Sequence, residues 1–181
     1  MKIIKKAGIE DNYLATIAIG ESYLSTWEKF ARPHWENYCE KYDLGLVVFN
    51  QHLIHNNHPK WKKPNWQKLL IGDRMKKSGF EEANVCYLDT DIIISPIAQN
   101  IFKEYDPSRF GLTSLRNRLP FPYLSVLRRL AFLRHKHYGK TYPLDSALFM
   151  SLEQLYSYHN LPTQSDEACT ALILFNVAKH Y

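Results

Sequence analysis

Short apolar runs alternate with stretches of helical spacing along the first half of the chain. The apolar runs are residues 13–20, 44–50 and 84–88, and each has the length of a buried strand. Between them, residues 25–42 and 65–77 carry apolar side chains at the intervals of one helix face. Strands that alternate with helices are typical of an α/β protein, so we predict a mostly parallel sheet flanked by helices.

Local signals add detail to this prediction. Ser25 and Glu28 have the spacing of a capping box, and Pro33 predicts a kink or restart in the helix that follows. Residues 96–105 begin with proline and predict a short helix, and residues 109–115 predict a fourth strand.

The composition indicates one globular domain. The chain has 181 residues, of which 45% are hydrophobic and 23% are charged. Its three cysteines form no C-x-x-C pair, so neither a disulfide framework nor a cysteine zinc site is expected, which favours a reducing, cytoplasmic setting. The chain has a basic start, but Glu10 and Asp11 precede any long apolar run, whereas a signal peptide has an apolar region there, so no signal peptide is expected.

Asp89 and Asp91 directly follow the third apolar run. Ligands of parallel α/β sheets bind beyond the carboxyl ends of the strands, which is where this pair is expected. On an extended chain, side chains two residues apart start on the same side, and two adjacent carboxylates repel each other unless a cation intervenes. Mg²⁺ or Mn²⁺ can bridge such carboxylates to substrate phosphates, so we predict a metal site. The alternative is that the aspartates cap a turn.

The stretch "VCYLDTDIII" resembles the metal-binding D-x-D strand of the A-type-fold (GT-A) glycosyltransferases, especially their glycogenin-like and galactosyltransferase-like members. The stretch that precedes it, "WQKLLIGDRMKKSGF", resembles the family's helix, and Lys68 matches its lysine. "GESYLSTWEKF" resembles the loop after the first strand, where Tyr23 matches the aromatic residue that approaches the base. "CTALILFNVAKHY" resembles a later strand, with Cys169 and Ala171 in place of the usual Asn and Gly and Asn176 matching the last Asn.

The resemblance implies a metal-dependent glycosyltransferase (hexosyltransferase-like) that moves a sugar from a nucleotide-diphosphate-sugar to an acceptor. It implies that Tyr23, Lys68, Asp89 and Asp91 bind the nucleotide-sugar, with Mn²⁺ or Mg²⁺ held by the two aspartates. Family members continue further than this chain, so residues 1–181 are expected to form a C-terminally incomplete domain, a minimal catalytic half or an inactive relative.

Asp166 and Glu167 precede the last strand and are the candidates for contact with the sugar or the reacting carbon. The alternative for this pair is a helix or turn cap.

Three other functions compete with the transferase. A phosphatase of the haloacid-dehalogenase type or a nucleotidyltransferase would use the same aspartates, although their accompanying motifs are absent. A non-catalytic module would use residues 107–144, which contain eight Lys or Arg and no Asp or Glu, to bind an anionic partner. That module would not explain the aspartates, and no nucleic-acid partner is expected.

Residues 121–140 predict an amphipathic helix. Leu124, Leu127, Leu130 and Ala131 line one stripe, with arginines towards the other side. One interpretation is a helix packed on the sheet. The other is a surface that meets an anionic acceptor or membrane, which would make the protein peripheral to a membrane.

Overall fold

The computed structural model describes residues 1–116, 121–137, 151–164 and 166–181. The chain divides into two compact units. Unit 1 consists of Met1–Gly111 and Ala171–Tyr181, and unit 2 consists of Leu112–Thr170. The prediction of a single glycosyltransferase-like domain stays a prediction.

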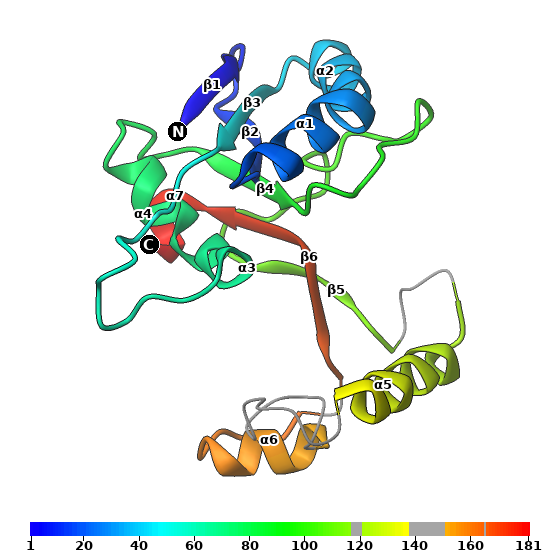
Figure 1. Cartoon of the computed structure of the whole chain (residues 1–181). Coiled ribbons are helices and arrows are strands. Elements are labelled where there is room, and N and C mark those ends of the chain that lie inside the picture. Colours follow the sequence, from blue (N-terminus) through cyan, green and yellow to red (C-terminus); the bar gives the residue numbers. More distant parts are fainter. Residues whose placement is uncertain (117–120, 138–150, 165) are drawn as a thin grey trace. The chain divides into compact units, whose positions relative to one another are not determined.

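The elements are labelled in Figure 1. The strands are β1 (Lys2–Lys5), β2 (Asn12–Ile17), β3 (Gly45–Phe49), β4 (Asn84–Leu88), β5 (Gly111–Ser114) and β6 (Ala168–Asn176). The helices are α1 (Glu21–Phe30), α2 (Arg32–Lys41), α3 (Pro64–Gln67), the 3-10 helix η1 (Lys68–Leu70), α4 (Ile71–Lys76), α5 (Tyr123–His137), α6 (Leu152–Tyr158) and α7 (Val177–His180). The predicted strands at 13–20, 44–50, 84–88 and 109–115 are all confirmed.

The protein is α/β, with a six-stranded sheet in the order β1-β3-β2-β4-β6-β5. β2 lies parallel to β3 and β4, whereas β1 runs antiparallel to β3 and β6 runs antiparallel to β4. The sheet is therefore mixed, and the prediction of a mostly parallel sheet is wrong at β1 and β6. Residues 6–11 are too few for the crossover that a parallel connection from β1 would need. An apolar run such as that of β6 can pair with a neighbouring strand in either direction, so the pattern did not predict the orientation of β6.

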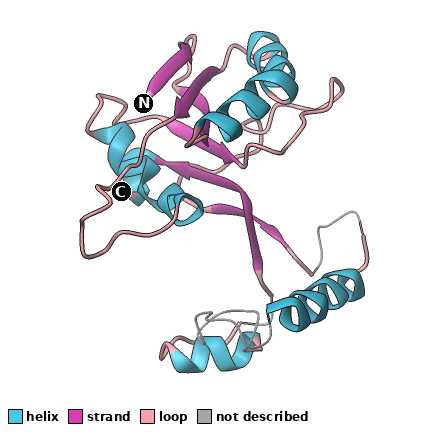
Figure 2. Cartoon of the chain, in the orientation of Figure 1, coloured by secondary structure: helices cyan, strands magenta, loops and turns pink. Residues whose placement is uncertain are grey.

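Helices cover both faces of the central strands (Figure 2). Alternation along β2 sends Tyr13 into the cluster that includes Met75 of α4, and Leu14 into the opposite cluster. That second cluster contains Trp27 of α1 and Trp35 of α2, which are both fully buried with ring centroids 5.7 Å apart.

The helix predictions at 25–42 and 65–77 are confirmed in position and corrected in detail. The first helix begins at Glu21, so Ser25 lies inside it and the predicted capping box is wrong. The restart is confirmed, because Pro33 lies in the first turn of α2. The predicted helix at 65–77 is confirmed as three consecutive segments, α3, η1 and α4.

Residues 92–105 follow the aspartates and consist of turns and irregular structure, so the helix predicted from Pro96 is wrong. Three side chains of α2 and that of Tyr42, just after it, donate hydrogen bonds to backbone carbonyls of this segment: Trp35 to Ile92 (2.9 Å), Tyr38 to Gln99 (2.7 Å), Lys41 to Pro96 (3.3 Å) and Tyr42 to Ala98 (2.8 Å). These bonds satisfy carbonyl groups that a helix would have used internally, so the segment lies along α2 without helical structure.

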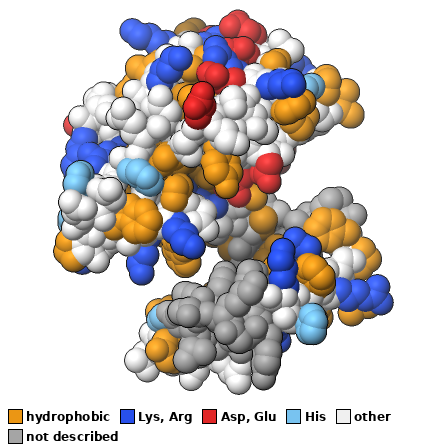
Figure 3. Space-filling model, in the orientation of Figure 1, with side chains coloured by type: hydrophobic (Ala, Val, Ile, Leu, Met, Phe, Trp, Pro, Cys, Tyr) orange, Lys and Arg blue, Asp and Glu red, His pale blue; other side chains and the backbone are white. Residues whose placement is uncertain are grey.

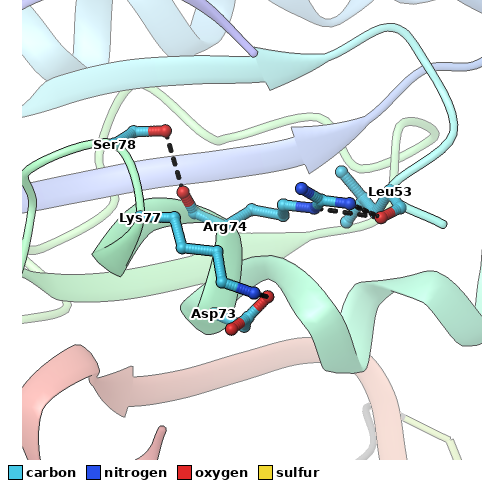
Figure 4. Close-up of polar contacts among 5 residues, drawn as sticks. All are labelled: Leu53, Asp73, Arg74, Lys77 and Ser78. Carbon is cyan, nitrogen blue, oxygen red and sulfur yellow. Dashed lines mark hydrogen bonds and ion pairs between the residues drawn. The ribbon is translucent and has the colours of Figure 1, made fainter.

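The chain after β3 is anchored to the helices at Leu53. Figure 4 shows the Arg74 guanidinium of α4 donating to the Leu53 carbonyl, with an Nε–O distance of 2.9 Å. The Leu53 amide donates to the Gln67 side-chain oxygen at 2.7 Å. On the outer side of α4, Lys77 pairs with Asp73 at 2.8 Å. Gln67, the residue just before Lys68, is thereby hydrogen-bonded to Leu53, which belongs to the buried core.

Three asparagines form a ladder across the sheet. The Asn84 side chain donates to Asn12 at 2.9 Å and accepts from Asn176 at 3.0 Å. Asn176 pairs with the first residue of β4, whereas Leu172 pairs with Leu88, the last. Asn176 therefore lies at the end of β4 opposite to Asp89, and its role there is to join strands and to cap α7.

Unit 2 contains the predicted helix within residues 121–140, observed as α5, and residues 138–140 lie outside the described residues. α6 begins with a capping box formed by Ser151 and Gln154. Among the helices that the structure describes, none is both long enough and apolar enough to cross a lipid bilayer.

Candidate functional site

The backbone at Asp89 is held by its neighbours on three sides. The Thr16 hydroxyl of β2 donates to the carbonyl of Leu88 at 2.7 Å and is fully buried. The Asp89 amide donates to the carbonyl of Ala171 in β6 at 2.9 Å, and the Asp89 carbonyl accepts from Ile92 at 3.2 Å. Asp89 is thus placed at the carboxyl end of β4, beside the end of the parallel strand β2.

Lys68 and Asp89 are 21 residues apart in sequence and form an ion pair. The Lys68 Nζ lies 3.1 Å from Asp89 Oδ1, and the lysine residue is only 8% exposed. The prediction that both residues lie at one site is consistent with this contact. A nearly buried ammonium requires a counter-charge, and Asp89 supplies one.

Tyr87 is part of this site, although sequence reasoning missed it. Its hydroxyl donates to the same oxygen, Asp89 Oδ1, at 2.6 Å, and Lys68 Nζ lies 5.1 Å from the centre of its ring. Burial raises the pKa of Tyr87, and so do its hydrogen bond to Asp89 and the charges of Asp89 and Asp91. The phenol therefore stays protonated and acts as a donor. The available signal was its spacing, because side chains two residues apart on a strand share a face.

Asp91 lies in a turn and is exposed. The expectation that both aspartates belong to an extended chain is wrong, because the Ile92 amide bonds back to the Asp89 carbonyl and closes a turn after β4. Asp91 nevertheless remains close enough to Tyr87 for its charge to raise the phenol pKa. The two carboxylates therefore act on the same local region.

The charges at this place favour a cation, because Asp89, Asp91 and Lys68 together carry one net negative charge. Lys68 and Tyr87 both contact Oδ1 of Asp89, so neither of these two contacts uses the second carboxylate oxygen, Oδ2. No group of three His, Cys, Asp or Glu among the described residues is placed to hold a metal ion. Two carboxylates fit a different kind of site, in which Mg²⁺ or Mn²⁺ is completed by phosphate oxygens and water.

Tyr23 lies near the beginning of α1, which follows the carboxyl end of β2. It is 68% exposed, so its ring is available to a ligand. Gly20 precedes α1 with φ of +95°, a conformation that favours glycine, and this residue makes the tight turn from β2 into the helix. Trp66 and Leu69, which flank Lys68 in sequence, are also exposed, although helical spacing had assigned them to the apolar face of the predicted helix.

Asp166 and Glu167 lie in unit 2, immediately before β6. Asp166 accepts hydrogen bonds from the Ser114 hydroxyl at 2.5 Å and from the backbone amides of Arg116 and Glu167. The Ser114 hydroxyl and the amides lower the pKa of Asp166. The Glu167 carbonyl accepts from the amide of Leu115. These contacts join the end of β5 to the start of β6, and a role in catalysis stays a prediction for both residues.

Searches of protein families, curated proteins and solved structures found no match for this chain.

Proposed function

We propose that this protein is a metal-dependent glycosyltransferase that uses a nucleotide-diphosphate-sugar as donor. The observation that carries the proposal is the contact of Lys68 with Asp89 at the carboxyl end of β4. A lysine that is almost buried and a pair of carboxylates in one place provide ligands for a divalent cation and a counter-charge for phosphate. The resemblance of the D-x-D strand and of the preceding helix to the GT-A family supports the same donor class.

Each residue has a distinct task in the proposal. Asp89 and Asp91 hold the cation, and Tyr87 orients Asp89 through its hydrogen bond. Lys68 contacts the diphosphate, and Tyr23 stacks on the base. A bound Mn²⁺ or Mg²⁺ would stabilise the negative charge that develops on the diphosphate leaving group. Lys68 contributes to the same stabilisation and, because it is held in place by Asp89, it needs little reorganisation.

The charge balance supports a diphosphate rather than a neutral ligand. With a divalent cation, the set of Asp89, Asp91 and Lys68 changes from one net negative charge to one net positive charge. The two negative charges of a nucleotide-sugar diphosphate are then attracted to a positively charged site. Without the cation, the same diphosphate would approach a site that already carries a negative charge, so binding of the two is expected to be cooperative.

A thermal-shift screen followed by a turnover assay tests the proposal. Nucleoside diphosphates and nucleotide-sugars are expected to raise the melting temperature only when Mn²⁺ or Mg²⁺ is present, because a ligand that binds only the folded state stabilises it. The stabilising nucleotide-sugar is then incubated with the protein, and release of nucleoside diphosphate is measured. If no nucleotide stabilises the protein with either metal, the proposed donor site is wrong. Binding without turnover would instead indicate an inactive relative.

Replacing Lys68 with Ala is expected to have opposite effects on the two ligands. Affinity for UDP in the presence of Mn²⁺ should fall about 10- to 100-fold, as expected for the loss of one charge-assisted contact. Affinity for Mn²⁺ alone should rise, because the ammonium no longer competes for Asp89. Calorimetric titrations with UDP, uridine and Mn²⁺ measure these effects.

Lys77→Ala is the matched control, because Lys77 pairs with Asp73 on the outer side of α4 and its side chain is 64% exposed. This variant should bind as the wild type does. Equal losses of affinity for uridine and UDP in Lys68→Ala would show that Lys68 does not contact the phosphates.

A further inference from the structure

The helix α5 exposes bulky apolar side chains to solvent. Leu124 and Phe132 are each 54% exposed and Leu127 is 44% exposed, and Phe121, just before the helix, is 49% exposed. Scattered exposed apolar residues are ordinary, but four within one short segment form an apolar patch, and such a patch is typical of an interaction surface.

The helix has two apolar faces, and only one of them is partly covered. Tyr123, Val126, Leu130 and Leu133 are half-buried and recur at helical spacing. Leu124, Leu127 and Ala131 lie together on a neighbouring stripe and are exposed. The predicted single stripe of Leu124, Leu127, Leu130 and Ala131 is therefore corrected. Leu130 belongs to the half-buried face, and the exposed stripe has no cover among the described residues.

Basic side chains border this exposed stripe. At about 100° per residue, Arg128 lies between the stripe and Phe132, and Lys136 and Arg129 lie just beyond Phe132. Arg134 lies on the other side of the stripe. All four are exposed, and residues 107–144 contain no Asp or Glu. Figure 3 shows blue and orange side chains side by side in this part of the face it draws. A stripe of apolar side chains between cations suits a surface that is apolar inside and anionic outside.

We propose that α5 is a membrane-surface helix that binds anionic lipid with its axis in the plane of the bilayer. The exposed apolar side chains enter the boundary between headgroups and acyl chains. Arg128 and Lys136 extend their charged ends to the lipid phosphates while their aliphatic parts stay beside the exposed apolar side chains. With 15 residues and four cations, the helix lies on the bilayer instead of crossing it. This inference is independent of the proposed transferase activity.

Lipid explains the patch better than nucleic acid or an acidic protein does. Phosphate backbones would engage the cations but would leave Leu124, Leu127 and Phe132 in water. Arg129 also lies 5.5 Å from the centre of the Phe132 ring, so charge and aromatic surface are presented together, as at a headgroup interface. Arg128 and Lys136, on either side of Phe132, match a flat anionic plane, whereas a protein groove would need matching acids on its walls.

Co-sedimentation of the full chain with vesicles tests this proposal. The protein is expected to bind vesicles of phosphatidylcholine with phosphatidylserine at low salt and to bind pure phosphatidylcholine vesicles weakly. The double variant Arg128→Gln with Lys136→Gln should lower the partition coefficient about 30-fold, because each basic residue near an anionic leaflet contributes about fivefold. Lys60→Gln with Lys103→Gln removes the same charge from exposed positions of unit 1 and should bind as the wild type does.

A second double variant separates lipid insertion from simple charge attraction. Leu124→Ser with Leu127→Ser keeps every cation, and it is expected to lose binding that persists after salt has screened the charges. Circular dichroism checks that both double variants keep their helical content. The proposal is overturned if the wild type does not sediment with anionic vesicles at low salt, or if the leucine variant binds them as the wild type does. Binding to an RNA oligonucleotide or an acidic peptide, but not to vesicles, would equally overturn it.

Discussion

Replacing Asp91 with Asn is expected to weaken the Mn²⁺-dependent binding of UDP about 100-fold or more. Two unit charges about 4 Å apart near a protein surface attract each other by roughly 4 kcal/mol, whereas a 100-fold loss of affinity corresponds to only about 2.7 kcal/mol. Asp89→Asn should have an effect of similar size. Calorimetric titration of UDP, with and without Mn²⁺, measures the metal-dependent part of the affinity. Asp73→Asn, which changes a carboxylate on the outer side of α4, serves as the control and should leave binding unchanged.

The same two variants are expected to differ in stability. Asp91 is exposed, so Asp91→Asn should change the free energy of unfolding by less than about 0.5 kcal/mol. Asp89 partners Lys68 and Tyr87, so Asp89→Asn should cost about 1–3 kcal/mol. Like-charge strain between the aspartates would predict a gain instead, but the pairing of Asp89 with Lys68 removes that strain. A double Asn variant that binds UDP and Mn²⁺ as tightly as the wild type would refute the metal site.

Replacing Trp35 with Ala is expected to lower the free energy of unfolding by about 3–5 kcal/mol. Its ring is fully buried against Trp27, and its indole nitrogen donates to the Ile92 carbonyl. The change therefore leaves a cavity between α2 and the sheet and frees a carbonyl in the segment after the aspartates. Denaturant unfolding monitored by circular dichroism measures the loss.

Two further variants separate the contribution of the buried ring from that of the hydrogen bond and from the loss of a tryptophan in general. Trp35→Phe keeps most of the buried ring and loses the hydrogen bond, so it should cost about 1–2 kcal/mol. Trp66→Ala is the matched control, because Trp66 is 59% exposed and its loss should change stability by less than about 0.5 kcal/mol. If Trp35→Ala is no more destabilising than Trp66→Ala, then α2 does not pack on the sheet as described.

The apolar pattern determined where the central strands lie. β2, β3 and β4 were predicted at their observed places because each is a short apolar run between polar turns. Such a run indicates a strand buried on both faces, whichever strands lie beside it. The pattern did not determine strand direction, since an apolar run can pair either way. β1, with its lysines, lacked the pattern of a strand and joins the sheet only by pairing with β3.

Competition for hydrogen bonds was decided by tertiary structure. Residues 96–105 have a helical start signal at Pro96, yet side chains of α2 and of Tyr42, just after it, donate hydrogen bonds to the carbonyl groups of this segment. Ser25 and Glu28 have the right spacing for a capping box, yet the helix begins four residues earlier, at the turn made by Gly20. A local motif indicates what a segment can do alone, and a nearby packed helix can offer a better arrangement.

At the candidate site, an acidic pair after an apolar strand singled out Asp89 and Asp91, and the resemblance to the GT-A family singled out Lys68. Only the tertiary structure decided that Lys68 is the ionic partner of Asp89 and that Tyr87 holds the same oxygen. It also decided that Asn176 lies at the far end of β4, because the register between β4 and β6 depends on strand direction. The physical reason is the same in each case. Residue type fixes which charges and donors a chain carries, whereas their distances depend on how segments far apart in sequence pack together.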